Sequence, residues 1–333
     1  MKRVLVFSCD AKFYEHAREL IASVRRTSPG VVDQFVFFDL GLRPEQRANL
    51  EATVVDYPVE LKAFYPDFLT PRMFAWKCYV LAEAAKLGDA ILYADCGCVA
   101  LNNIAPLFDA IERDGVLMVK DDHRNDERTH EACLRIMNAT ASERTATQID
   151  AGMIGYTAHG PYARIFSEAF TFAQQRDCIF GDAREHRHDQ SIYSILAARY
   201  GVPVMHPYGR YLHWRGIESR DQIIWQHRGK WPAFKGLIAR AAAAKPSRVA
   251  IYGAGQHTNR FISTFRSVLE PRHTIVGVLD DSPKAATFGD LPLLPTTTLA
   301  DLRPDVVLLS SDAHEEAMRS RIQGVDLWPL YTA

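Results

Sequence analysis

Residues 74–99, FAWKCYVLAEAAKLGDAILYADCGCV, decide the fold of this chain. Apolar residues recur at helical spacing and predict a helix over residues 72–87, with Lys77 in its apolar stripe. The run ILYA then predicts a buried strand that ends at Asp95. The carboxyl ends of parallel strands open into the ligand crevice of an α/β sheet, so Asp95 lies where a site is expected. A buried carboxylate needs a cation or hydrogen-bond donors, for which a metal ion, Lys77 or the backbone of the next turn are the candidates, and a simple turn residue stays the alternative.

The surrounding sequence repeats this alternation of strand and helix. Strands are expected at residues 3–9, 34–40 and 53–59 with helices between them, which is the pattern of an open α/β sheet. A strand at 149–157 and a helix at 191–200 continue it. Residues 121–135, DDHRNDERTHEACLR, are too polar for a core and predict a surface loop that could close over a ligand. Their Asp121-Asp122-His123 run is typical of a solvated face, with a metal cluster as the weaker interpretation.

The composition of the chain limits the kinds of partner that it is expected to bind. The chain has 333 residues, 47% of them hydrophobic and 24% charged, with 39 Lys and Arg against 40 Asp and Glu. This balance predicts a globular chain of two domains without a nucleic-acid or anionic-lipid footprint. No segment predicts a signal peptide or a transmembrane helix, so a cytoplasmic location is expected. The six cysteines lack zinc-ligand spacing and predict reduced thiols, and Cys96 and Cys98 are interpreted as small packing residues.

A second α/β unit is expected after an alanine-rich linker at residues 239–246. The linker divides the chain into two predicted domains, residues 1–238 and 247–333. In VAIYGAGQHTNRFI, Gly253 and Gly255 would let a phosphate approach a helix N-terminus, and Asp280 would meet a ribose hydroxyl at the end of the next strand. The unit resembles the small Rossmann-like domains of sugar-modifying enzymes. An intact ligand site and a degenerate packing or dimerisation module both stay open, and the second would form a homo-oligomer.

Four segments of the first domain together resemble the GT-A glycosyltransferases, in particular the retaining family of the bacterial lipopolysaccharide galactosyltransferases and glycogenin. The quoted stretch matches the family's basic helix and its metal-binding strand, with Lys77 at the basic position and Asp95 at the first acid. Gly97 stands in place of the second acid, which leaves a hard cation one oxygen ligand short. QIDAGMIGYT, HDQSIYSIL and IIWQHRGKWP resemble the three later elements of the family.

The resemblance implies roles for individual residues. Asp150, Asp189 and Gln190 would contact the transferring sugar, although Asp189 also suits a helix N-cap. Asp95 and His227 would hold a divalent cation, Mn²⁺ or Mg²⁺, while Lys230 and Lys77 would meet the diphosphate. The nucleotide base would lie near Ser8 and Asp10 at the end of the first strand. A surface turn is the alternative for the segment around His227.

The sequence therefore predicts a glycosyltransferase with a GT-A domain, that is, a nucleotide-diphospho-sugar transferase fold, followed by a Rossmann-like domain. The expected donor is a nucleotide sugar, foremost a UDP-sugar, and the acceptor is a glycan in bacterial surface polysaccharide synthesis. A noncatalytic nucleotide-sugar-binding scaffold with a degenerate metal site is the main alternative. A sugar nucleotidyltransferase is disfavoured because no glycine-rich basic loop follows the first strand, and an NAD-dependent oxidoreductase would need nicotinamide binding at GAGQHT.

Overall fold

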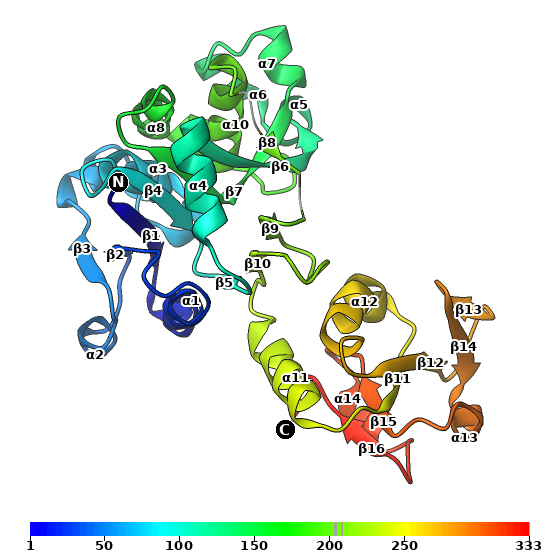
Figure 1. Cartoon of the computed structure of the whole chain (residues 1–333). Helices are drawn as coiled ribbons and strands as arrows, with labels where there is room; N and C mark the ends of the chain where they lie inside the picture. The colour runs from blue at the N-terminus through cyan, green and yellow to red at the C-terminus, as the bar shows by residue number, and fades with distance from the viewer. Residues whose placement is uncertain (203–204, 208, 333) are drawn as a thin grey trace. The chain divides into compact units, whose positions relative to one another are not determined.

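A computed structural model describes residues 1–202, 205–207 and 209–332 (Figure 1). The chain forms two compact units: unit 1 comprises Met1–Leu212 and Ile223–Gln226, and unit 2 comprises His213–Gln222 and the chain from His227 onward. Both are built of helices packed on largely parallel sheets. The predicted α/β fold, with a second α/β unit after the first, is confirmed.

The sheet of unit 1 has the strand order β3-β2-β1-β4-β7-β6-β8. Strands β3, β2, β1 and β4 run parallel, and β7 is antiparallel to both β4 and β6. Strands β5, β10 and β9 form a separate small sheet in that order. The strands are β1 (Arg3–Cys9), β2 (Gln34–Asp39), β3 (Thr53–Asp56), β4 (Ala90–Ala94), β5 (Cys98–Ala100), β6 (Val116–Arg124), β7 (Thr147–Thr157), β8 (Met205–His206), β9 (Leu212–His213) and β10 (Ile224–Gln226).

Apolar side chains from the two faces of this sheet form two cores, because neighbouring strand residues point to opposite faces. On β1, Val4 and Val6 enter one core while Leu5 and Phe7 enter the other, and all four are buried. The α-helices of unit 1 are α1 (Tyr14–Thr27), α2 (Pro44–Ala48), α3 (Ala75–Ala84), α4 (Ala105–Asp114), α5 (Asn125–Arg128), α6 (Glu131–Ile136), α7 (Ala141–Thr145), α8 (Ala163–Ala173), α9 (Arg176–Ile179) and α10 (Asp189–Arg199).

Two elements of unit 1 differ from the sequence prediction. The helix expected at 72–87 is shortened to α3, because Phe74 has a left-handed backbone (φ 57°) that starts the helix anew. The polar segment 121–135 is regular structure and not a loop: it extends β6, then forms α5 and part of α6. Buried Asn125 donates to the Glu143 carbonyl at 2.8 Å, which ties this segment to α7.

Unit 2 contains a sheet of order β13-β14-β12-β11-β15-β16. Its elements are α11 (Trp231–Ala243), β11 (Arg248–Tyr252), α12 (Gln256–Leu269), β12 (Thr274–Asp280), β13 (Thr287–Phe288), β14 (Leu291–Pro295), α13 (Leu299–Leu302), β15 (Val306–Leu309), α14 (Glu315–Arg319) and β16 (Asp326–Trp328). The division into units falls before the boundary predicted at 238–247. The physical reason is α11, which packs Phe234 on Phe261 of α12 with ring centres 4.9 Å apart and carries most of the expected linker as helix.

The six cysteines are free and buried, which agrees with the packing role expected for Cys96 and Cys98. Cys133 of α6 and Cys178 of α9 bring their sulfur atoms to 3.3 Å. Within the described residues, no helix is both long and apolar enough to cross a bilayer.

Candidate active site

Lys77 is the centre of the candidate site in unit 1. Its side chain is 3% exposed, and the ammonium group lies 3.0 Å from Asp95 Oδ1 and 3.3 Å from Asp189 Oδ2. It also donates to the Ala151 carbonyl of β7 at 3.2 Å. One buried cation therefore joins α3, the end of β4, β7 and the start of α10. This arrangement satisfies the requirement that a buried charge be paired and hydrogen-bonded.

The environment of this triad controls its protonation. Burial by itself lowers the pKa of Lys77, but Asp189 and Asp95 outweigh burial and raise that pKa above its usual value. The ammonium also lies 5.4 Å from the centre of the Phe74 ring and 5.1 Å from that of Tyr93, which favours the charged form. Burial raises the pKa of Asp189, Lys77 opposes this shift, and Asp95 adds to it. Lys77 therefore stays protonated between its two carboxylates.

Asp189 is the first residue of α10 and not its N-cap, which is His188. His188 has an unusual backbone for a non-glycine residue (φ 53°, ψ −121°), and its ring Nδ1 lies 2.8 Å from the Ile179 carbonyl oxygen. This bend directs the chain so that the Asp189 carboxylate meets Lys77. The side chain of Asp189 is only 5% exposed, so pairing with Lys77, and not helix capping, accounts for its place in the site.

Asp95 is the most accessible acid of the triad, with 28% of its side chain exposed. The Tyr93 hydroxyl donates to Oδ1 at 2.8 Å, and the Gln226 amide donates to Oδ2 at 3.3 Å. Gly152 of β7 makes room for that amide: a Cβ at this position would lie 2.1 Å from Gln226 Nε2. A side chain at position 152 would therefore displace the Gln226 amide from its place beside Asp95.

The other residues of unit 1 that were predicted to contact the donor lie as follows. Asp150 of β7 is 4% exposed, and its Oδ1 accepts from the Gly152 amide at 2.6 Å. Gly97 lies half-buried in the turn between β4 and β5. The Ser8 hydroxyl donates to the Phe38 carbonyl at 2.7 Å and lies 2.9 Å from the Tyr57 hydroxyl. Asp10 accepts from the Lys12 amide at 3.1 Å. Ser8 and Asp10 thus have structural partners, and their proposed contact with a base stays a prediction.

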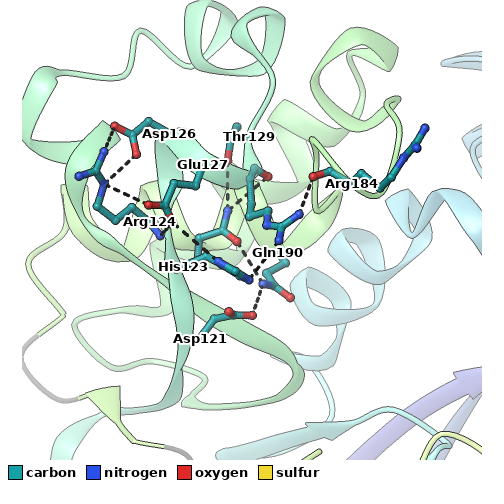
Figure 2. Close-up of polar contacts among 10 residues, drawn as sticks. Asp121, His123, Arg124, Asp126, Glu127, Thr129, Arg184 and Gln190 are labelled. Atoms are coloured by element: carbon teal, nitrogen blue, oxygen red, sulfur yellow. Dashed lines mark hydrogen bonds and ion pairs between the residues drawn. The ribbon is translucent and has the colours of Figure 1, made fainter. Parts of the chain in front are cut away.

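Gln190 is held by two residues that sequence reasoning did not assign to the site. Its amide nitrogen donates to Asp121 Oδ2 at 3.0 Å and to Gln148 Oε1 at 3.2 Å, and Figure 2 shows the Asp121 contact between α10 and β6. Along β6, Lys120 and Asp122 are exposed while Asp121 is partly buried, so the segment alternates with the period of a strand. That alternation was the available signal for Asp121. The neighbouring charges pair among themselves, as Arg124 does with Asp126 at 2.8 Å.

His227 and Lys230 lie in unit 2, in the turn before α11. His227 Nδ1 accepts from the Gly229 amide at 3.1 Å and the Trp231 amide at 3.4 Å. A neutral imidazole that accepts at Nδ1 carries its proton on Nε2. Lys230 Nζ pairs with Asp312 Oδ2 at 3.1 Å, and this lysine lowers the pKa of Asp312.

The loop expected to bind a ligand in unit 2 is tied to its own sheet. Gly253 has a left-handed backbone (φ 106°), and a Cβ there would lie 3.0 Å from the Ser310 carbonyl oxygen. Asp280 Oδ2 accepts from the Ala254 amide at 3.0 Å, so this carboxylate holds the loop. Gly255 is exposed before α12, with open space around its Cα. These contacts give Gly253 and Asp280 structural roles, and a ligand at Gly253, Gly255 and Asp280 stays a prediction.

The residues as arranged do not fit a divalent cation. Gly97 supplies no oxygen side chain, so this turn offers one carboxylate, Asp95, and its oxygens are shared with Lys77, Tyr93 and Gln226. In His227 the lone pair of Nδ1 accepts from backbone amides, and Nε2 carries the proton of the neutral ring. Neither nitrogen therefore offers a lone pair to a metal ion. Across the described ranges of the chain, no three His, Cys, Asp or Glu side chains gather as metal ligands would.

No protein-family model and no curated protein sequence matches this chain. Similar solved structures include galactosyltransferase LgtC with donor and acceptor sugar analogues (19% identity over 63% of this chain and 75% of that chain, TM-score 0.45). Mouse xyloside xylosyltransferase 1 in its apo form matches at 11% identity over 63% and 86%, TM-score 0.40. Core-mannan synthase A from Aspergillus fumigatus, in a Mn/GDP form, matches at 9% identity over 60% and 70%, TM-score 0.42. These neighbours belong to the class that the sequence resembles, and at such identities and scores the likeness supports no particular donor, acceptor or site.

Proposed function

We propose that this chain is a glycosyltransferase, which moves a sugar from a nucleoside-diphosphate sugar to a glycan or sugar acceptor in bacterial surface polysaccharide synthesis. The single observation that carries the proposal is the joining of Lys77, Asp95 and Asp189 by one buried ammonium group. All three come from segments that resemble glycosyltransferase motifs. A buried triad with one accessible carboxylate at the end of a parallel strand is the arrangement expected of a ligand site.

The chemistry of transfer suits an acidic site. As the bond from the anomeric carbon to the diphosphate oxygen breaks, positive charge develops on the sugar and negative charge on the departing diphosphate. The acceptor oxygen forms the new bond to that carbon, and its proton leaves with the diphosphate or to a carboxylate. Asp95, with 28% of its side chain exposed, is the acid we assign to the sugar. Lys77 and Asp189 are the groups that position Asp95.

The other residues receive supporting roles. Gln190 has its amide nitrogen engaged by Asp121, which directs the amide oxygen as an acceptor for a sugar hydroxyl. Asp150 orders β7 through the Gly152 amide. Ser8 and Asp10 are assigned to the nucleotide base, and Lys230 to the leaving phosphates.

The cation expected from the family resemblance has no step in this mechanism, because the donor set does not fit it. Whether Mn²⁺ or Mg²⁺ bound by Asp95 and His227 assists transfer is tested by comparing turnover in EDTA and in added metal. The Rossmann-like unit is assigned an accessory role. A cytoplasmic location and homo-oligomer formation through that unit stay predictions.

A noncatalytic nucleotide-sugar-binding scaffold is the second candidate function. It is favoured by Gly97, which removes an acid that the family uses. Both candidates predict binding of a nucleotide, so binding alone does not separate them. Turnover of the donor does.

The experiment combines calorimetry with a donor-hydrolysis assay on the full chain. UDP and GDP are titrated first, and a panel of UDP- and GDP-sugars is then followed for release of the nucleotide, with and without a mixture of saccharide acceptors. The transferase predicts release from at least one donor, stimulated by an acceptor. Nucleotide binding with no release over the whole panel would reject the transferase and favour the scaffold.

A further inference from the structure

Unit 2 gathers three arginines around one tryptophan. The guanidinium carbons of Arg228, Arg215 and Arg260 lie 4.9, 5.2 and 5.9 Å from the centre of the Trp214 ring. The indole is half-buried, while the three arginines are exposed. They come from separate segments, namely the stretch before β10, the turn before α11, and the second turn of α12. The fold of unit 2 therefore brings these cations together.

Two of the three arginines of this cluster lack a compensating carboxylate within the described ranges. Among the residues that the structure describes, neither Arg228 nor Arg260 forms an ion pair with a carboxylate. An aromatic face stabilises a guanidinium group modestly, whereas several like charges around one ring repel each other. A bound anion would relieve that repulsion. Guanidinium groups favour phosphate in particular, because their planar fork forms paired, charge-assisted hydrogen bonds.

The backbone around Arg228 is also constrained. Arg228 has a left-handed conformation (φ 48°), which is unfavourable for a residue with a side chain, and Gly229 follows with φ 86°. His227 fixes this turn by accepting from the Gly229 amide at 3.1 Å. The turn therefore holds the Arg228 side chain over Trp214 in place of a relaxed conformation.

The two residues of this turn that the family resemblance assigns to the metal and the phosphates are engaged within unit 2. His227 accepts backbone amides at Nδ1, and Lys230 pairs with Asp312 at 3.1 Å. Arg228 lies between them in the sequence and has no carboxylate partner among the described residues. The exposed cation of this turn is thus the arginine.

We propose that Trp214, Arg215, Arg228 and Arg260 form a binding site for a diphosphate group, which the guanidinium groups hold without a divalent cation. The expected ligand is the nucleoside diphosphate of the sugar donor, and this choice of ligand rests on the proposed function. A phosphate-bearing acceptor would present part of the same chemistry. Inorganic pyrophosphate, UDP, UMP and a sugar phosphate separate these sources, because a diphosphate engages more guanidinium groups than a monophosphate.

The test is calorimetry on the full chain, titrated with each of these four ligands in EDTA and again in Mn²⁺. Pyrophosphate and UDP are expected to bind with the same dissociation constant in both buffers, and UMP and the sugar phosphate about tenfold more weakly. Arg228→Gln and Arg260→Gln are each expected to weaken pyrophosphate binding about tenfold, and the double variant further. All variants should keep the melting temperature of the parent chain.

Arg303→Gln is the matched control, because Arg303 is an exposed arginine of unit 2 with the same left-handed backbone (φ 44°). It should leave pyrophosphate binding unchanged. The proposal is overturned if pyrophosphate binds no tighter than about 1 mM, if EDTA abolishes binding, or if the two arginine variants match the control. Tighter binding of the sugar phosphate than of pyrophosphate would also overturn it. Arginine-dependent pyrophosphate binding in a chain that turns over no donor would keep this site and reject the transferase.

Discussion

The charged cluster around Lys77 and the charged cluster around Trp214 differ in how their charges are balanced. In unit 1, Lys77 is 3% exposed and meets two carboxylates, so each buried charge has an opposite charge within 3.3 Å. In unit 2, the guanidinium groups of Arg215, Arg228 and Arg260 all lie within 5.9 Å of the centre of the Trp214 ring. A buried charge must be compensated inside the protein, whereas an exposed group of like charges can leave its compensation to a ligand.

Each cluster favours a different kind of ligand charge. The acid-rich cluster suits a group that develops positive charge, and the arginine cluster suits an anion such as a diphosphate. The two clusters should also affect different quantities, one the free energy of unfolding and the other the affinity for a ligand. Substitutions of the buried members of the first cluster, Lys77 and Asp189, should lower the stability of unit 1, whereas substitutions in the second cluster should mainly change ligand affinity.

Replacing Lys77 should have the largest effect on stability. Lys77→Met leaves Asp95 and Asp189 without their shared cation, which should lower the free energy of unfolding of unit 1 by about 3–5 kcal/mol. Urea unfolding followed by circular dichroism measures this. Lys86→Met removes an exposed lysine paired with Glu83 and is expected to cost less than about 1 kcal/mol.

A further substitution sharpens that prediction. Asp189→Asn in the Lys77→Met background removes one of the unpaired buried charges and should restore part of the lost stability. A Lys77→Met protein as stable as the Lys86→Met control would show that the triad is not the buried charge centre described above.

Gly152→Ala should have the next largest effect. The new methyl group would meet the Gln226 amide at 2.1 Å and Asp150 Oδ1 at 2.9 Å, so the site must shift at a cost of about 1–3 kcal/mol. Thermal unfolding gives the measurement. Gly255→Ala is the control, since its Cβ would enter open space at a backbone that is not left-handed. Equal melting temperatures for the two variants would contradict the close packing at Gly152.

Both units should lose stability in acid through one histidine each, the buried His186 in unit 1 and the half-buried His257 in unit 2. Burial, with His130 and His188 beside it, lowers the pKa of His186 to about 3, and burial lowers that of His257 to about 4. Each is neutral in the fold but protonates near pH 6.5 in the unfolded chain. Their contribution is therefore present above pH 6.5 and is lost as the pH falls toward 3 for His186 and toward 4 for His257.

Substitution isolates these contributions. His186→Gln and His257→Gln should each reduce the slope of unfolding free energy against pH between 6 and 4, by at most about 1.4 kcal/mol per pH unit. Chemical denaturation at a series of pH values measures the slope. An unchanged slope in either variant would mean that this histidine protonates freely in the folded protein.

Substitution of Lys230 is expected to change the free energy of unfolding least. Its ion pair with Asp312 is partly exposed on both sides, so Lys230→Met should lower the free energy of unfolding by no more than about 1 kcal/mol. Asp312→Asn should cause a loss of similar size in the same denaturation experiment. A loss above 2 kcal/mol in either would place this pair with the buried triad, and the contrast between the units would fail.

Periodicity and strand ends made much of the fold and part of the site predictable. The apolar run before Asp95 was sufficient to place a buried strand, whereas Lys77 was one of three candidate partners for Asp95, beside a metal ion and the backbone of the next turn. Asp189 was ambiguous, because an acid at a helix start suits a cap or a site equally well. In the structure His188 is the N-cap and Asp189 lies 3.3 Å from Lys77, while contact of Asp189 with a sugar stays a prediction.

The contacts that escaped prediction are long-range and polar. Gln190 meets Asp121, which lies 69 residues earlier, and Gln226 meets Asp95 across 131 residues. Hydrophobic patterning carries no information on such pairs. The alanine-rich end of α11 has the composition of a linker, yet Phe234 in the same helix anchors it on α12. Tertiary packing thus accounts for a helix that runs into the expected linker.

Turnover of the Asp95→Asn variant tests the central claim most directly. Asp109→Asn is its control, because Asp109 is an exposed acid of α4 paired with Arg3. With the donor found in the hydrolysis panel, Asp95→Asn should lower kcat by about 10²-fold or more, while its melting temperature stays near that of the control. Unchanged turnover, or a loss of turnover that only follows a loss of fold, would contradict the assignment of Asp95 to the reacting sugar.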